Sequence, residues 1–152
     1  MPKIDIARAK VRTKGVYPTP WRAITEGREK TALGDVAGLT QFGVNLTRLK
    51  PGAASSLRHW HEKEDEFVFI LRGEVVLIED DGETVLKPGD AAGFKANSGN
   101  GHHLVNKSSS DVVLLEIGSR AKRERAEYSD VDMQIVRDEN GARYSHKDGR
   151  PY

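Results

Sequence analysis

Four of the five histidines in this chain of 152 residues fall in two short clusters, His59-Trp60-His61 and His102-His103. Side chains alternate between the two faces of an extended strand, so His59 and His61 point to one side and Trp60 to the other. Glu66 follows five residues after His61 and adds a carboxylate. Two imidazoles and a carboxylate on one short extended stretch are ligands that suit a divalent metal ion.

Glu66 heads a strand face that is otherwise apolar, because Val68 and Ile70 follow it at every second position. A carboxylate on such a face is costly unless a positive or hydrogen-bonding group meets it. A metal ion would supply that charge. In the second cluster, His102 and His103 lie on opposite faces of a strand. From the residues alone, either of them could be the fourth ligand.

Other charged residues near these clusters have simpler interpretations. A single histidine usually forms a hydrogen bond or lies at the surface, and we interpret His146 in this way. Glu62, Glu64 and Asp65 are typical of a solvated turn. Lys95, Glu62 and Glu64 are weak candidates for a general base, because a solvated charge explains each of them better. The sequence therefore identifies no catalytic residue.

The overall charge excludes several classes of function. With 24 basic and 23 acidic residues, the net charge is +1, and no basic stripe predicts a nucleic-acid or membrane surface. The densest basic run, 122–125, is interrupted by Glu124 and is expected to be solvated. Cysteine is absent, which excludes disulfides, thiolate metal sites and cysteine nucleophiles. A charged N-terminus and the lack of long apolar runs predict a cytoplasmic protein.

The middle of the chain predicts an all-β fold. Short apolar runs alternate with turn signals in which glycine or proline provides the required backbone angles, a pattern typical of a β-sandwich or barrel. The turn signal at 80–82 predicts one hairpin, and the signal at 138–141 predicts another. The apolar runs are 42–49, 67–71, 75–78, 84–86, 91–94, 103–105 and 112–117.

We expect three segments: an N-terminal arm packed on the barrel (1–40), the barrel itself (41–118) and a C-terminal extension (119–152). The arm has no sustained period, and its anchors are expected to be Tyr17 and Trp21, with a short helical piece at 20–25. The extension is expected to pack through Tyr144 and Tyr152. On the barrel's outer face, Trp60, Phe67 and Phe69 need a cover, which the arm or a second subunit could provide. We therefore expect a homodimer.

The first histidine cluster resembles the first sequence motif of the cupin superfamily, and the chain is similar to a group of small, single-domain, uncharacterised bacterial cupins. That motif places a glycine before an H-x-H pair, then a glutamate, then a second glycine. Gly52, His59, His61, Glu66 and Gly73 match it, with one extra residue between Gly52 and His59.

The second cupin motif is matched less closely. Gly89 is present, but Lys95 and Asn97 replace the proline and the glycine of the motif, and the loop that follows is two residues longer. The match resumes at His102 and Asn106. The resemblance covers about residues 41–118 and makes His102 the counterpart of the family's third histidine ligand.

The resemblance implies a double-stranded β-helix, or jelly roll, with one divalent metal ion held by His59, His61, Glu66 and His102. A mixed nitrogen and oxygen donor set suits Zn, Fe, Mn, Ni or Cu. It further implies an enzyme that acts on a small oxygen-rich molecule as an oxygenase, an isomerase or a lyase. The alternative is a module that binds a small ligand without catalysis, as a sensor. Sensory cupins are usually joined to a DNA-binding part, and no helix-turn-helix pattern precedes the barrel here.

Overall fold

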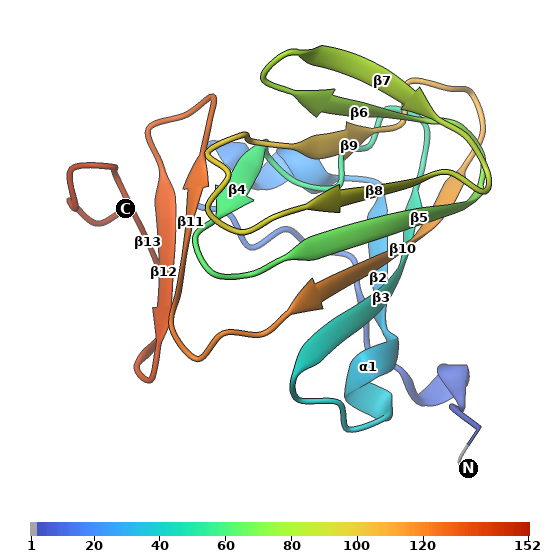
Figure 1. Cartoon of the computed structure of the whole chain (residues 1–152), viewed down its shortest axis with the longest axis horizontal. Coiled ribbons are helices and arrows are strands. Elements are labelled where there is room, and N and C mark those ends of the chain that lie inside the picture. The colour runs from blue at the N-terminus through green and yellow to red at the C-terminus, as the bar shows by residue number, and fades with distance from the viewer. Residues whose placement is uncertain (1–2) are drawn as a thin grey trace.

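The computed structural model describes residues 3–152, and almost all of its regular structure is antiparallel sheet (Figure 1). Three short helices occur, η1 (Ile6–Arg8), η2 (Trp21–Thr25) and α1 (Leu33–Val36). The strands are β1 (Val11–Arg12), β2 (Arg28–Ala32), β3 (Phe42–Leu49), β4 (His59–His61), β5 (Glu66–Arg72), β6 (Val75–Glu79), β7 (Gly82–Leu86), β8 (Ala91–Phe94), β9 (His103–Val105), β10 (Val112–Ser119), β11 (Glu124–Tyr128), β12 (Gln134–Asp138) and β13 (Gly141–Ser145).

The strands form three sheets that surround the site. A six-stranded sheet has the order β1-β2-β3-β10-β5-β8, and a three-stranded sheet has the order β7-β6-β9. The third sheet, β13-β12-β11-β4, uses the C-terminal strands to carry the short histidine strand β4 (Figure 1). The predicted all-β class is confirmed. In the described part of the chain, no helix has the length and apolar character that crossing a membrane would require.

The core lies between the six-stranded and three-stranded sheets. Val68 and Ile70 on β5 are buried, whereas Phe67 and Leu71 are 42% and 46% exposed. The predicted alternation along β5 is therefore confirmed, and it places Glu66 on the inward face. The main buried cluster consists of Leu49, Ala53, Val68, Ile70, Val75, Leu77, Leu86, Leu104, Val112 and Leu114.

Both predicted hairpins are present, as β6–β7 and β12–β13, but three strands were not predicted, β1, β2 and β11. Both β2 and β11 are rich in charged residues, which hides their alternation. The expectation that the run 122–125 is solvated is wrong for Glu124, which is buried. Its carboxylate accepts hydrogen bonds from the backbone N–H groups of Glu62 and Lys63, and these bonds compensate for the lost water.

The terminal segments pack against each other as well as on the barrel. Tyr17 is buried, and its ring meets that of Tyr128 edge to face at 5.5 Å. Trp21 begins the 3₁₀ helix η2 and packs on Tyr152, with 5.3 Å between ring centroids. Both residues thus contact the C-terminal extension, and Tyr17 also accepts a hydrogen bond from the Leu57 N–H of the barrel at 3.2 Å. The arm also adds β1 and β2 to the six-stranded sheet, yet it leaves Phe67 42% exposed.

Two glycines of the first motif have different structural demands. Gly52 and Gly73 both have positive φ, at 83° and 79°. A Cβ on Gly73 would lie 2.6 Å from the carbonyl oxygen of Asp111, whereas a Cβ on Gly52 would meet nothing within 4 Å. We expect Gly52→Ala to lower the free energy of unfolding by about 1 kcal/mol through backbone strain alone. Gly73→Ala adds overpacking and should cost about 3 kcal/mol.

Urea unfolding of both variants, followed by circular dichroism, measures this difference. Equal losses in the two variants would show that the crowding at Gly73 has no energetic weight.

Candidate metal centre

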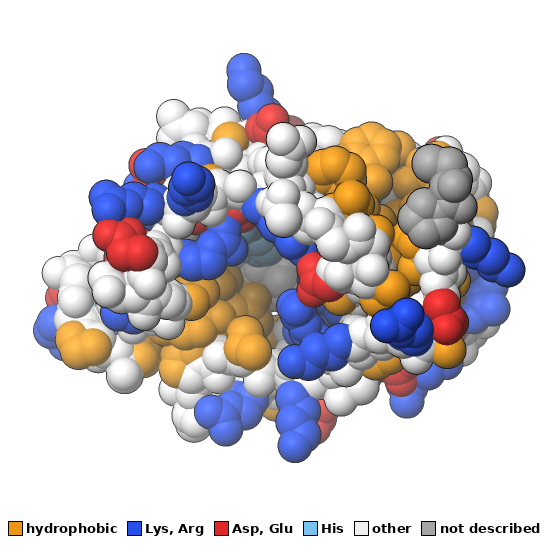
Figure 2. Space-filling view, turned by 90° about the horizontal axis from the view of Figure 1, so that it is seen from below, with side chains coloured by type: hydrophobic (Ala, Val, Ile, Leu, Met, Phe, Trp, Pro, Cys, Tyr) orange, Lys and Arg blue, Asp and Glu red, His pale blue; other side chains and the backbone are white. Residues whose placement is uncertain are grey.

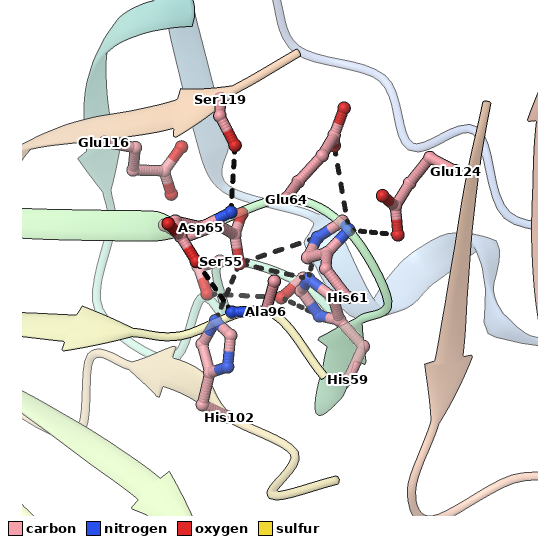
Figure 3. Close-up of polar contacts among 12 residues, drawn as sticks. Ser55, His59, His61, Glu64, Asp65, Ala96, His102, Glu116, Ser119 and Glu124 are labelled. Atoms are coloured by element: carbon pink, nitrogen blue, oxygen red, sulfur yellow. Dashed lines mark hydrogen bonds and ion pairs between the residues drawn. The ribbon is translucent and has the colours of Figure 1, made fainter. Parts of the chain in front are cut away.

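Two imidazoles and a carboxylate converge inside the barrel. Nε2 of His59 lies 3.2 Å from Nε2 of His61, and Oε2 of Glu66 lies 3.7 Å and 3.5 Å from these two atoms. One ligand atom from each of the three residues lies within 4.8 Å of the others. His102 reaches the same carboxylate, with Nε2 at 2.9 Å from Glu66 Oε2. The four predicted residues are therefore neighbours in space, and Figure 3 shows the three histidines side by side.

Strand register explains why His102 faces this cluster and His103 does not. His59 and His102 form an antiparallel bridge, each backbone N–H donating to the other's carbonyl. Directly opposed residues in such a pair have side chains on the same face. Phe94 stacks on the His102 ring at 3.5 Å and fixes its plane. His103 turns away, with Nδ1 at 2.9 Å from the carbonyl oxygen of Ser56.

The tautomer of His59 is set by its surroundings. Nδ1 lies 2.8 Å from the carbonyl oxygen of Leu57, which can only accept, so Nδ1 carries the proton. Nε2 then presents a lone pair toward His61 and Glu66. Burial, assisted by the nearby His61 and His102, lowers the pKa of His59 to about 4. The neutral imidazole that a metal requires is thus the form present at neutral pH.

His61 lies between two further carboxylates on its other side. Nδ1 is 3.8 Å from Glu64 and 3.6 Å from Glu124 (Figure 3). Burial alone lowers the pKa of His61, but Glu66, Glu64 and Glu124 outweigh burial, and the net shift is upward. The expectation that Glu64 lies in a solvated turn is wrong. Glu64 is buried, accepts a hydrogen bond from the Ala121 N–H and pairs with Arg137.

These contacts test whether the residues suit a cation. Nδ1 of His61 is buried without a hydrogen-bond partner, and its two carboxylate neighbours favour a proton there. If His59 and His61 both carry their protons on Nδ1, their Nε2 lone pairs face each other across 3.2 Å. The neighbouring histidines, above all His102 with Nε2 at 2.9 Å, outweigh burial and hold the pKa of Glu66 well below its usual range. Such a set of lone pairs beside a carboxylate could hold a divalent metal ion.

A cavity of about 450 Å³ leads to this cluster. Figure 2 looks into the hollow face of the molecule and shows lysine and arginine side chains gathered around the opening. On the inner wall, Glu116 on β10 lies 2.7 Å from Nζ of Lys30 and accepts a hydrogen bond from Thr47 at 3.0 Å. Both contacts use Oε2. The hydrogen bonds of the described residues leave Oε1 without a partner.

Sequence reasoning missed Glu116 as a lining residue. The signal was present, because Glu116 interrupts the apolar run of β10 at an inward position, between Leu114 and Gly118. The structure also locates two of the residues considered as a general base from the sequence. Lys95 is exposed, and Glu62 is paired with Arg125 at 2.9 Å.

The family follows from comparison with known proteins. A family model described as a cupin domain matches residues 45–118. A crystal structure described as a sugar phosphate isomerase from a cupin superfamily, from Silicibacter pomeroyi, is 46% identical, with a TM-score of 0.96. The alignment covers 99% of this chain and 96% of that one. This chain belongs to the cupin superfamily. The predicted double-stranded β-helix of this cupin is thereby confirmed.

More distant structures share the fold of this cupin. A putative sugar phosphate isomerase from Acidithiobacillus ferrooxidans is 24% identical, with a TM-score of 0.83 over 100% of this chain and 94% of that one. A predicted oxalate decarboxylase from Thermotoga maritima is 20% identical, with a TM-score of 0.62 over 79% of this chain and 100% of that one. Comparison with curated proteins gave no match.

Proposed function

We propose that this cupin is a metal-dependent isomerase of a small phosphorylated sugar. The observation that carries the proposal is the cavity in which the His and Glu cluster and the carboxylate of Glu116 are open to one ligand. The cupin from Silicibacter pomeroyi, 46% identical over nearly the whole chain, is described as a sugar phosphate isomerase and supports this choice over an oxygenase or a lyase.

In this proposal His59, His61, Glu66 and His102 bind one divalent metal ion, with Zn, Fe, Mn, Ni and Cu all compatible with the donors. A metal ion held there would polarise the sugar's carbonyl group and stabilise negative charge on its oxygen. The carboxylates of Glu64 and Glu124 would orient His61 through its Nδ1–H, as hydrogen-bonded carboxylates do for metal-binding histidines.

Glu116 is the cavity carboxylate best placed to move a proton. Of the other lining carboxylates, Glu66 contacts His102, Glu64 pairs with Arg137, and Asp35 is exposed and pairs with Arg120. Oε1 of Glu116 would take the proton from the carbon beside the carbonyl and return it to the former carbonyl carbon. An aldose–ketose conversion needs only this transfer and a matching proton shift between the two oxygens, so no electrons enter or leave.

The test is turnover after reconstitution. Protein stripped with a chelator is loaded with each of the five metals in turn and incubated with a panel of aldose and ketose phosphates, with products resolved by NMR. Isomerisation that requires one of the metals is the expected result. Saturable binding without any conversion would contradict the isomerase and favour a non-catalytic ligand-binding module, and oxygen consumption would favour an oxygenase.

We also propose that two copies pair through the outer face of the six-stranded sheet. Val11, Phe42, Phe67 and Leu71 lie on that face and are between 41% and 53% exposed. Burying them would remove apolar surface from water. Light scattering should give twice the 16.8 kDa mass of one chain, and Phe67→Glu should shift the mass toward one chain. A wild-type mass of one chain would contradict the dimer.

A further inference from the structure

The cations that line the cavity are not all neutralised. Arg120 pairs with Asp35 at 2.5 Å, and Arg12 pairs with the same carboxylate at 3.4 Å. Lys30 pairs with Glu116, and Arg137 pairs with Glu64. The fifth lining cation, Arg28 on β2, forms no ion pair with any residue in the range 3–152.

The guanidinium of Arg28 is also short of hydrogen bonds. Its Nη1 donates to the carbonyl oxygen of Ser55 at 2.5 Å, but Nε is buried and has no partner. Nη2 donates to no described residue either. Leaving a half-buried guanidinium without a counter-charge is unfavourable. The surroundings of Arg28 are therefore incomplete without an anion.

Elsewhere in this protein, arginines hold oxyanions through Nε and Nη2, and on Arg28 the donor left for a ligand is Nη2, because Nε is buried. Arg48 binds the two oxygens of Glu29 through Nε and Nη2, at 3.2 and 2.8 Å. Arg123 binds Glu139 through the same two atoms, at 3.1 and 2.7 Å. This fork matches carboxylate and phosphate oxygens in pairs.

Arg28 is linked to the candidate metal centre by a short chain of contacts. Its partner Ser55 is followed by Ser56, whose hydroxyl lies 3.3 Å from Nδ1 of His59. A ligand held by the Arg28 guanidinium would thus lie in the same cavity as the His and Glu cluster. Lys30 lies two residues further along β2 on the same face as Arg28, and its partner Glu116 lies on β10 of the same sheet, so both line the cavity beside Arg28.

We propose that Arg28 binds the phosphate group of the ligand and so orients the sugar between the metal centre and Glu116. This inference rests on the proposed function for the identity of the ligand. Its recognition chemistry, a guanidinium and an oxyanion, can be tested separately.

The experiment measures binding of inorganic phosphate to chelator-treated protein by calorimetry. Arg28→Gln should weaken binding by about 10- to 100-fold, the effect of losing charge-assisted hydrogen bonds. Arg12→Gln is the matched control, because it removes the same charge from the same cavity at a residue already paired with Asp35. We expect Arg12→Gln to change the affinity less than about 3-fold, and Arg28→Lys to recover part of the loss.

Equal weakening by the Arg28 and Arg12 variants would show that phosphate responds to the general positive field, and would overturn the assignment. An unchanged affinity in Arg28→Gln would overturn it too. If that variant does not fold, wild-type protein answers the question through phenylglyoxal modification read by mass spectrometry. Phosphate should then protect Arg28 and leave Arg12 unprotected, and the reverse pattern would reject the proposal.

Phosphate binding to metal-free protein needs no turnover. If Arg28→Gln lost phosphate binding and the metal-loaded wild type showed no isomerase activity, the anion site would be supported and the isomerase rejected. If the wild type isomerised a sugar phosphate but Arg28→Gln bound phosphate with unaltered affinity, the isomerase would be supported and the anion site at Arg28 rejected.

Discussion

His61→Ala is expected to reduce metal affinity by more than about 100-fold, so that the purified variant retains almost no metal. Loss of a hydrogen-bonded group behind a metal ligand already costs about 10- to 100-fold, and removal of a ligand should cost more. His61 also has contacts on both sides of its ring. Nε2 faces His59 and Glu66, and Nδ1 faces Glu64 and Glu124. Elemental analysis of protein purified without added metal gives the content directly.

His103→Ala provides the matched control for that measurement. It removes an imidazole one residue from His102, but from a side chain that contacts the Ser56 carbonyl on the other face. We expect this variant to keep the metal content of the wild type. Metal retained by His61→Ala, or lost in His103→Ala to the same extent, would show that the four-residue assignment is wrong.

The parts of the site that depend on single strands were accessible from the sequence. Alternation puts His59 and His61 on one face of β4, and it puts Glu66 on the inward face of β5 with Val68 and Ile70, both local properties that need no knowledge of the fold. The choice of His102 over His103 is different, because it depends on the bridge that pairs His59 with a residue far along the chain. Register of that kind is set by the whole barrel. Only the family resemblance could supply it in advance.

The polar residues that line the cavity or contact the candidate metal centre could not be predicted, for a related reason. Glu64, Glu124 and Arg28 all lie in charged stretches that resemble solvated surface. The burial of Glu64 and Glu124 is compensated by backbone N–H groups of distant segments, that of Ala121 for Glu64 and that of Glu62 for Glu124. Composition identifies a charge but does not show which backbone group will meet it. The strands β2 and β11 were missed because the same charged residues mask the apolar alternation.

Glu116→Gln is expected to lower kcat by about 10²- to 10³-fold on whichever sugar phosphate the wild type converts, with metal content unchanged. General-base groups contribute about this much, and the amide has nearly the same shape but cannot accept the proton. Thr47 can still donate to the amide oxygen, so the fold should survive. The matched control is Glu29→Gln, since Glu29 also pairs with a cation, Arg48, outside the cavity.

Deuterium incorporation distinguishes proton transfer from a merely structural role of Glu116. In D₂O, a carboxylate that carries the proton between carbons can exchange it with solvent, so the wild-type product should gain deuterium at the former carbonyl carbon. The Glu116→Gln variant should lose exchange and turnover together, whereas Glu29→Gln should retain both. If Glu116→Gln isomerised its substrate at the wild-type rate, another group would have to be the base. A third outcome is that the variant loses turnover while the wild type shows no exchange with solvent. A direct transfer of hydrogen between the two carbons would then explain the reaction better. In that case Glu116 would act by holding Lys30 in place.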